Sequence, residues 1–562
     1  MADYNEIAFE REICEHMAAG GWLYSENDAG YDRERALFPE DVFHWLAETQ
    51  PEELAKVVDP DGPRTEQQKG QLLDRLVKAL DNPLESGGGT LSILRNGFSH
   101  LSAKFSMCEF QPETDWNETT LANYKANRVR VMRQVHFSTQ DQRSIDLVAF
   151  VNGLPVLTIE LKTDFTQTVH DAIRQYRKDR QPRGKDGHVE PLLSFGHRAL
   201  VHFAVSNDEV HMTTRLAGEK TRFLPFNKGR DQGAGNPVNP DGSATSYLWE
   251  EVLTRDSLLD ILHRFLHLET STSRDAITGQ VKKSTVLLFP RYHQWDAVTK
   301  LTEAAKKEGP GQKYLIQHSA GSGKTNSIAW TAHRLARLHG FDNEKIFDSV
   351  IVVTDRNVLD AQLQEAIKQI DGKIGLVAAI GKDEVQKSGA GSKSGLLAQS
   401  LAQGKLIIVV TLQTFPFAIK EIRESDALKG KTFAVIADEA HSSQSGKTAG
   451  ELKTMLSDEQ RQLLEEEGEI EVSTDDILAA QTAARASADN ISFFAFTATP
   501  KPKTLELFGR DNADGVPEPF HLYSMKQAIE EEFILDVLRG YTTYDTAFEL
   551  YENGEKSEVV DE

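Results

Sequence analysis

The sequence has few of the features that mark secreted or membrane proteins. Its 562 residues include only two cysteines, Cys14 and Cys108, too few for a disulfide framework or a cysteine-based metal site. The first residues, "MADYNEIAFEREICEHM", are charged and lack the apolar core of a signal peptide. No apolar run approaches the length of a membrane span. These absences predict a protein of the reducing cytoplasm, with no membrane partner.

Positive charge is also scarce. The chain has 63 Lys and Arg against 86 Asp and Glu, a formal net charge of −23, which argues against a uniformly basic nucleic-acid-binding protein. The charge is unevenly distributed along the chain, however. Residues 457–476 contain many of the acidic side chains, whereas residues 126–137 and 174–185 are basic. Binding depends on local patches, so these two basic segments keep a nucleic-acid partner open.

A chain of this length is expected to hold several domains, and the sequence pattern changes near the polar residues 268–285. Before this boundary we expect helical patterns and a few strands, with a long loop at 227–245. After it, apolar runs alternate with helix-like segments, which is typical of a parallel sheet with helical crossovers. The strands expected there are 313–319, 349–354, 406–411, 433–438 and 492–497.

The segment "LIQHSAGSGKTNSIAW" (315–330) places a glycine-rich loop between a strand and a helix, as a phosphate-binding loop requires. Lys324 would contact the β- and γ-phosphate oxygens of ATP, and Thr325 would bind Mg²⁺. His318 replaces the first glycine of the strict GxxxxGK[ST] pattern, which leaves this mechanism intact. The predicted ATP-contacting residues of the loop are Gly321, Ser322, Gly323, Lys324 and Thr325.

A second motif, "FAVIADEAH" (433–441), ends a predicted buried strand with two acids. Asp438 can hold the Mg²⁺ that accompanies ATP, and Glu439 can polarise the attacking water. The alternative is that the two acids only cap a helix after the strand, but this role would explain at most one of Asp438 and Glu439. With "RYHQWDAV" (291–298) and "FTATP" (496–500), these motifs resemble those of superfamily 2 helicases and translocases.

The resemblance to superfamily 2 implies that Gln294 reads the adenine and that His441, Thr497 and Thr499 couple hydrolysis to movement along DNA. Residues 352–357 and 409–415 fit the DNA-contacting strand ends of this family loosely, and ordinary strand ends explain them equally well. Such motors take an arginine finger from a second RecA-like domain, and nothing after residue 500 matches it. We therefore expect a fragment that binds ATP, hydrolyses it poorly and does not translocate.

Upstream, "SIDLVAFVNGLPVLTIELK" (144–162) is predicted to be a β-hairpin that turns at Asn152-Gly153. Asp146, Glu160 and Lys162 interrupt its apolar strands and fit the PD-(D/E)xK nuclease arrangement. Two carboxylates and a strand-end carbonyl suit Mg²⁺, and the lysine would stabilise phosphate charge or orient water. The alternative is the solvated edge of an ordinary hairpin, although unpaired charges in apolar strands are costly to bury.

The order of these parts resembles the restriction (R) subunit of type I restriction-modification enzymes. The resemblance rests on "FEREICEHMAAGGWLY", "RQVHFS", "DLVAFVNGLPVLTIELK", "TRFLPFNKG" and the DEAH-type motif. It implies a multidomain α/β protein that uses ATP and Mg²⁺, binds double-stranded DNA together with methyltransferase (M) and specificity (S) subunits, and cuts away from the recognition site. The implied units are a PD-(D/E)xK endonuclease domain (1–267), a first RecA-like domain (268–505) and a connector (506–562) toward an absent second one.

Carried over to this sequence, the resemblance implies that Asp146 and Glu160 bind the Mg²⁺ of the nuclease site. It also implies that Gln175, from a QxxxY motif, is a further catalytic residue. Asp179 stands where that motif has tyrosine, which puts the tyrosine's role in doubt. Glu10 on the first helix is either an auxiliary acid or, by preference, a solvated helix position.

Two other interpretations remain open. One is a type III restriction subunit or another helicase–nuclease fusion, although in type III subunits the nuclease usually follows the motor. The other is a non-cutting, ATP-dependent DNA-binding scaffold in which the acids of the hairpin are structural.

Overall fold

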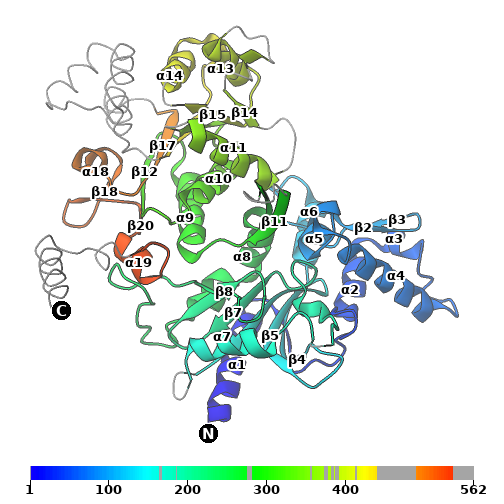
Figure 1. Ribbon diagram of the computed structural model, residues 1–562. Coiled ribbons are helices and arrows are strands. Elements are labelled where there is room, and N and C mark those ends of the chain that lie inside the picture. The colour runs from blue at the N-terminus through cyan, green and yellow to red at the C-terminus, as the bar shows by residue number, and fades with distance from the viewer. Residues whose placement is uncertain are drawn as a thin grey trace, which may run out of the picture.

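The structure is a computed structural model that describes residues 2–163, 167–184, 186–274, 281–354, 357–371, 377–380, 385–386, 392–411, 414–438 and 489–535. Two seven-stranded sheets, each with helices on both faces, form its main body, and Figure 1 shows the N-terminal sheet below the C-terminal one. Among the described residues, no helix is both long enough and apolar enough to cross a membrane.

The N-terminal sheet is mixed, with the strand order β1-β4-β5-β6-β7-β8-β9. β1 pairs parallel to β4 and β6 pairs parallel to β7, and the other neighbours are antiparallel. Its strands are β1 (Leu23–Ser25), β4 (Val129–His136), β5 (Ser144–Val151), β6 (Leu154–Leu161), β7 (Val201–Val205), β8 (Val210–Thr213) and β9 (Leu224–Pro225).

The predicted hairpin is confirmed as β5 and β6. Asn152 (φ +49°) and Gly153 (φ +83°) both adopt positive φ at the turn, as a two-residue hairpin loop requires. A side chain at Gly153 would place its Cβ 2.4 Å from the Phe38 carbonyl oxygen, so the close approach of the chain also requires glycine there.

Two helices cover the opposite faces of this sheet. α1 (Ala2–Ala19) contributes Phe9 and Ile13 to a large apolar cluster on one face. On the other face, α7 (Val169–Asp179) packs on β6 and β7, where Tyr176 contacts Thr158 and His202. The charged ends of β5 and β6 therefore lie between two helices.

Smaller elements flank the N-terminal sheet, and residues 227–245 form the predicted loop, with an isolated β-bridge between Arg230 and Gly233. The flanking elements are α2 (Pro39–Thr49), α3 (Pro51–Ala55), α4 (Thr65–Leu80), the 3-10 turn η1 (Leu84–Ser86), α5 (Thr90–Asn96), β2 (Phe98–His100), β3 (Ala103–Phe105), α6 (Glu118–Ala126) and η2 (Pro191–Leu193).

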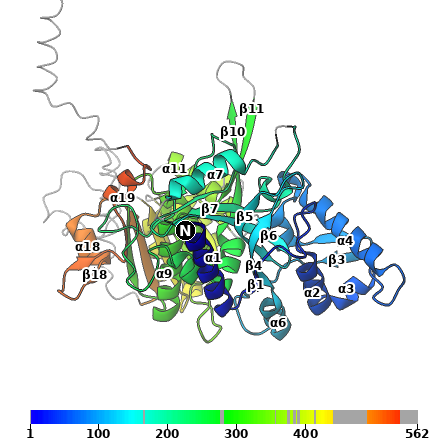
Figure 2. The ribbon, with the colours of Figure 1, turned by 90° about the horizontal axis from the view of Figure 1, so that it is seen from below.

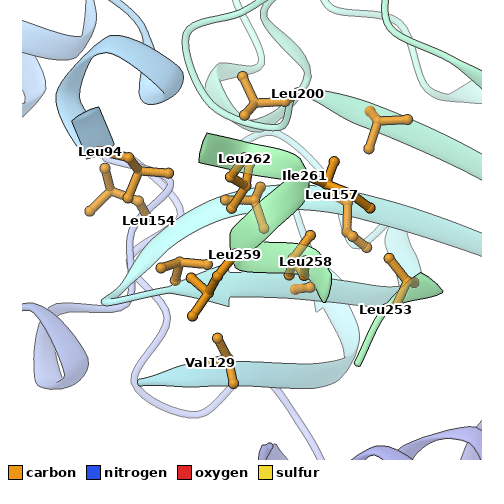
Figure 3. Packing of buried hydrophobic residues seen from close by; sticks show 14 of the residues in the cluster. Leu94, Val129, Leu154, Leu157, Leu200, Leu253, Leu258, Leu259, Ile261 and Leu262 are labelled. Atoms are coloured by element: carbon orange, nitrogen blue, oxygen red, sulfur yellow. The ribbon is translucent and has the colours of Figure 1, made fainter. Parts of the chain in front are cut away.

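A helical segment joins the two sheets: η3 (Leu248–Val252), α8 (Arg255–Asp260) and η4 (Ile261–Phe265). Figure 3 shows its leucines, among them Leu258 and Leu262, packed on β6, the strand that carries Leu154 and Leu157. The same cluster continues into the C-terminal part through Trp330, whose Nε1 donates to the Phe265 carbonyl at 2.9 Å. The N-terminal apolar core therefore extends to α9 (Tyr292–Glu308) and α10 (Lys324–Leu335), while the C-terminal sheet has separate apolar clusters on its two faces.

Residues 268–285, predicted to be a polar boundary, belong largely to an antiparallel hairpin of β10 (His267–Arg274) and β11 (Val281–Leu288). Figure 2 shows these strands projecting from the body. The polar composition predicted a break in structure, whereas alternating Ser and Thr residues also suit a two-stranded ribbon exposed to water on both sides.

The C-terminal sheet is entirely parallel, in the order β14-β15-β13-β16-β17-β12-β20. All five strands expected here are present, and β14 and β20 extend the sheet at its two edges. β20 lies in the segment predicted to be a connector, so the sheet continues past residue 505. The strands are β12 (Lys313–His318), β13 (Ser349–Thr354), β14 (Val377–Ala379), β15 (Ile407–Thr411), β16 (Phe433–Asp438), β17 (Ile491–Thr497) and β20 (His521–Tyr523).

Helices cover both faces of this parallel sheet, as the alternating pattern predicted. One face packs on α9 (Tyr292–Glu308), α10 (Lys324–Leu335) and α11 (Asn357–Asp371). The other packs on α13 (Lys393–Ala402), α14 (Phe415–Glu424) and α18 (Pro502–Phe508). Short elements complete the described chain: η5 (Asp426–Leu428), β18 (Arg510–Asp511), β19 (Pro517–Glu518) and α19 (Met525–Glu530).

Candidate functional site

The hairpin brings its three predicted residues to one end of the N-terminal sheet. Asp146 Oδ2 accepts a hydrogen bond from the Leu161 backbone nitrogen at 2.8 Å, which fixes Asp146 beside the end of β6. Glu160 is fully buried, and Asp146 and Lys162 are each 8% exposed. The solvated-edge interpretation is therefore wrong for these charges, and burial at this depth demands partners.

Glu160 has one bound oxygen and one unbound oxygen. Its Oε1 accepts from Arg180 Nε at 2.5 Å, whereas its Oε2 is buried and has no hydrogen-bond partner among the described residues. Burial and the neighbouring charge of Asp146 raise the pKa of Glu160 well above its usual range, against the lowering effect of Arg180. A buried carboxylate oxygen without a donor is a natural position for a cation.

Lys162 points toward the first helix. Its Nζ donates to Glu6 Oε1 at 2.6 Å. Burial alone would lower the pKa of Lys162, but Asp146 and Glu6 more than offset this effect, and the pKa is raised. The lysine is therefore a cation held among carboxylates, the state needed to stabilise the charge of a phosphate.

Glu10 also faces this cluster and is only 1% exposed, so its interpretation as a solvated helix position is wrong. Arg133 binds one of its oxygens through two nitrogens at 2.9 and 2.8 Å, and Gln134 Nε2 donates to the other at 2.8 Å. Burial and the charge of Asp146 raise the pKa of Glu10. The sequence pattern missed this burial because α1 has both charged and apolar residues around its circumference.

Gln175 lies half-buried on α7, and among the described residues its side chain forms no hydrogen bond with Asp146, Glu160 or Lys162. The adjacent Tyr176 is fully buried, with its hydroxyl 2.7 Å from Thr158 Oγ1. Burial and the charge of Glu160 raise the pKa of Tyr176 well above its usual value. The catalytic role assigned to Gln175 stays a prediction.

The site around Asp146 and Glu160 offers oxygen atoms as ligands for a hard divalent cation. Among the described residues, no group of three or more His, Cys, Asp or Glu side chains is arranged to hold a metal ion. An ion at this site would therefore depend on Asp146, the open oxygen of Glu160 and a backbone carbonyl, an oxygen-only set that fits Mg²⁺ or Mn²⁺.

The basic segment 126–137, interpreted as a potential nucleic-acid patch, is largely neutralised inside the protein. Arg128 and Arg130 both bind the buried Asp41 at 2.6 Å, and Arg133 binds Glu10. In the second basic segment, Arg180 turns inward to Glu160. Local positive charge in the sequence therefore reflects internal ion pairs at these positions rather than a basic surface.

A second candidate site lies at the carboxyl edge of the parallel sheet. The loop between β12 and α10 contains Gly321 (φ +73°) and Gly323 (φ +80°), and α10 begins at Lys324. Lys324 is 8% exposed, and its Nζ lies 3.3 Å from the His318 carbonyl oxygen and 3.4 Å from that of Ser319. The loop thus has the strand–loop–helix geometry predicted for phosphate binding.

Gln294 braces this loop. Its Oε1 accepts from the Arg291 backbone nitrogen at 2.9 Å, and its Nε2 lies 3.0 Å from the Gly323 carbonyl oxygen and 3.3 Å from that of Ser322. The predicted contact of Gln294 with adenine stays a prediction. Ser322 is buried and Thr325 half-buried beside it.

His318, which replaces the first glycine of the loop pattern, is fully buried and ties the loop to two other elements. Its Nε2 lies 2.8 Å from His521 Nδ1, and His521 Nε2 lies 3.0 Å from Asp296 Oδ2. Burial lowers the pKa of His318 well below its usual value. This chain from α9 through β20 to the loop was not predicted, because its members are far apart in sequence.

The remaining motor residues lie on neighbouring strands of the same sheet. Asp438 ends β16, which pairs with β17, and Thr497 ends β17 opposite Gln317 of β12. Asp438 and Thr497 therefore lie at the carboxyl edge next to the phosphate loop, while Thr499 is exposed just beyond. Glu439 and His441 lie outside the described residues.

Comparisons with known families match the N-terminal and C-terminal parts of the chain to two different families. Residues 3–221 match the family described as type I restriction enzyme R protein N terminus, and residues 293–559 match the SWI2/SNF2 ATPase family. The C-terminal parallel sheet is thus a SWI2/SNF2-like ATPase domain.

Three curated relatives are named as endonuclease subunits of type I restriction enzymes. The HindI subunit of Haemophilus influenzae is 25% identical over 72% of this chain and 34% of its own length. The putative MjaVIIIP subunit of Methanocaldococcus jannaschii is 24% identical over 59% of this chain and 31% of its own. The SsaAORF53P subunit of Staphylococcus saprophyticus is 23% identical over 73% and 36%, respectively. The chain thus spans about a third of the length of these relatives.

Proposed function

Because the chain belongs to the family of type I restriction enzyme R subunits, we propose that it provides the nuclease and the first ATPase domain of an enzyme that cuts double-stranded DNA. The observation that carries the proposal is the convergence of Asp146, Glu160 and Lys162 at one end of the N-terminal sheet. The phosphate loop in the same chain supplies the second half of the argument.

A PD-(D/E)xK endonuclease domain is proposed for residues 1–267. Its support is a mixed sheet with helices on both faces and a hairpin whose end carries two buried acids and a lysine. The RecA-like motor domain is proposed for 268–505, continued by β20 at the edge of its sheet.

In the proposed nuclease site, Asp146 and the unpartnered Oε2 of Glu160 would hold a Mg²⁺ ion. When bound, the ion supplies a Lewis acid and lowers the pKa of a coordinated water. Lys162 remains protonated beside Asp146 and can hold the scissile phosphate or orient the water. Arg180 keeps Glu160 in place from the side of α7.

In the proposed motor site, Lys324 and the loop amides bind the phosphates of ATP, and Thr325 with Asp438 would hold the accompanying Mg²⁺. Gln294, Glu439, His441, Thr497 and Thr499 retain the roles that the superfamily 2 resemblance gives them. Double-stranded DNA and the M and S subunits are the proposed partners, as the R-subunit family implies.

The nuclease proposal is tested by cleavage of plasmid DNA with Mn²⁺ or Mg²⁺ as the metal. We expect metal-dependent cleavage by the wild type, loss of cleavage in Glu160→Ala, and retention in the control Glu12→Ala, which alters an exposed residue of α1. Equal residual cleavage in wild type and Glu160→Ala would refute the nuclease.

The ATPase proposal is tested separately by the binding of a fluorescent ATP analogue. Lys324→Ala is expected to lose binding, while Lys307→Ala, at an exposed position of α9, is expected to bind as the wild type does. Unchanged affinity in Lys324→Ala contradicts the assignment of the loop.

A further inference from the structure

Gln134 occupies an unusual position in the middle of β4. It lies across from Asp146, between the paired residues Arg133–Leu147 and Val135–Ile145. Its φ is +48°, a strained region that residues other than glycine rarely adopt. A strand interior keeps such a conformation only where other interactions hold it.

The Gln134 side chain provides these interactions. Its Nε2 donates to Glu10 Oε1 at 2.8 Å and to Asp146 Oδ1 at 3.2 Å, and its Oε1 accepts from Ser144 Oγ at 2.8 Å. Ionised carboxylates only accept hydrogen bonds, so the amide nitrogen must face the two acids. The orientation of the amide is therefore fixed by three groups.

Asp146 is consequently held at both oxygens. Its Oδ1 accepts from Gln134 and its Oδ2 from the Leu161 backbone nitrogen at 2.8 Å, directly after Glu160 in the chain. The Leu161 bond alone would leave the carboxylate free to rotate about it. The two hydrogen bonds together fix the orientation of the Asp146 carboxylate relative to the unpartnered oxygen of Glu160.

We infer that Gln134 is a positioning residue that holds Asp146 and Glu10 in the arrangement in which the site binds its divalent cation. The inference rests on the proposed nuclease function and adds to it a residue that neither the motif nor its spacing identifies. The strained backbone at Gln134 serves to aim its amide between the two acids.

The Gln134 bridge also separates two like charges. Glu10 is bound on its other oxygen by Arg133, and Asp146 is the largest neighbouring charge acting on Glu10. Removal of the amide donor would take one hydrogen bond from each of these two carboxylates. Residues that orient metal ligands through a hydrogen bond typically change metal affinity about 10- to 100-fold when removed.

The test is Mn²⁺ binding by the full chain, measured by electron paramagnetic resonance or calorimetry, together with the Mn²⁺ concentration that gives half-maximal cleavage. Gln134→Gly removes the amide and accommodates the positive φ, and its melting temperature is measured alongside to separate loss of metal binding from loss of folding. We expect its Mn²⁺ dissociation constant to rise about tenfold or more. Gln134→Asn, whose amide is one methylene shorter, is expected to weaken binding in the same direction.

The matched control is Gln232→Gly. Gln232 also has positive φ (+59°) but is exposed in the loop 227–245, so this variant should bind Mn²⁺ as the wild type does. If the wild type binds and cleaves while both Gln134 variants match it in Mn²⁺ affinity, the positioning role is refuted and the nuclease stands. If the wild type shows neither Mn²⁺ binding nor cleavage, the nuclease proposal fails, and the role of Gln134 fails with it.

Discussion

Arg180 at the end of α7 and Glu160 on β6 form a buried ion pair, with Arg180 Nε 2.5 Å from Glu160 Oε1. Arg180 also donates through Nη2 to the Ser144 carbonyl at 2.6 Å, which ties α7 to the start of β5. The pair therefore anchors the helix and orients the carboxylate whose other oxygen is unpartnered.

Removal of Arg180 should leave Glu160 buried without its counter-ion. We expect Arg180→Met to lower the free energy of unfolding in urea by about 3–5 kcal/mol, the typical result of breaking one side of a buried pair. Arg174→Met is the control, because Arg174 lies on the same helix but is largely exposed. The double variant Arg180→Met/Glu160→Gln should recover part of the loss. Similar losses in both arginine variants would contradict the role of the buried pair.

The phosphate loop offers a test based on glycine. A Cβ at Gly323 would lie 2.5 Å from Gln294 Nε2, and its φ is +80°. We expect Gly323→Ala to displace Gln294 and weaken binding of a fluorescent ATP analogue at least roughly tenfold, which corresponds to about 1.4 kcal/mol.

Gly404→Ala is the control for backbone strain. Gly404 has φ +67° and no heavy atom within 4 Å of the added Cβ, so the variant carries the strain of the left-handed conformation without a clash. Its nucleotide affinity should equal that of the wild type. Equal loss of affinity in both variants would assign the effect to general destabilisation.

The five predicted strands of the parallel sheet were correct because each is a largely apolar run whose side chains are mostly buried in the sheet. The hairpin was equally predictable, since Asn152-Gly153 permits the positive φ of its turn. The sequence pattern predicted these elements correctly because their conformation depends on their own residues.

Partners that meet from distant parts of the chain were not predictable. Glu6 and Lys162 are 156 residues apart, and Glu10 and Arg133 are 123 apart. A single sequence shows that Arg133 is charged but not that it faces inward, so its segment suggested a basic surface. The same limit hid Gln134, whose strained φ depends on groups from two other elements, α1 and β5.

Buried histidines predict how stability depends on pH. Burial lowers the pKa of His202, His263 and His293 to about 3 each, and that of His318 well below its usual value. In the unfolded chain these groups titrate near 6.5. The unfolded state therefore binds more protons below that pH, and the free energy of unfolding should fall as the pH drops from about 6.5 toward the folded pKa values.

The contribution of one histidine to the slope of the free energy of unfolding against pH can be measured with a variant. Glu10 and Glu160, whose pKa values are raised mainly by burial, act in the opposite direction, so the wild-type curve alone is ambiguous. A variant such as His202→Asn should flatten the curve below about pH 6 by up to about 1.4 kcal/mol per pH unit. Parallel curves for wild type and variant in urea denaturation would rule out His202 as a source of the pH dependence.

The last prediction concerns the junction between the two sheets. Asp260 on α8 binds Arg264 at 2.8 Å and also binds Arg334 of α10, in the ATPase part. Burial alone would raise the pKa of Asp260, but Arg334 and Arg264 outweigh it and the pKa is lowered. Arg334 is itself buried, and its Nε has no hydrogen-bond partner among the described residues. Asp260 is thus the carboxylate that binds arginines from both sides of the junction.

We therefore expect the wild type to unfold in one calorimetric transition, because the apolar cluster of the N-terminal sheet also packs on α9 and α10 of the C-terminal part. Asp260→Asn leaves Arg334 buried without its counter-ion. It should lower the free energy of unfolding by about 3–5 kcal/mol and split the transition into two. Asp426→Asn, which disrupts an exposed pair with Lys429, should leave the transition unchanged. A single transition at the wild-type temperature in Asp260→Asn would show that the apolar core alone couples the two parts.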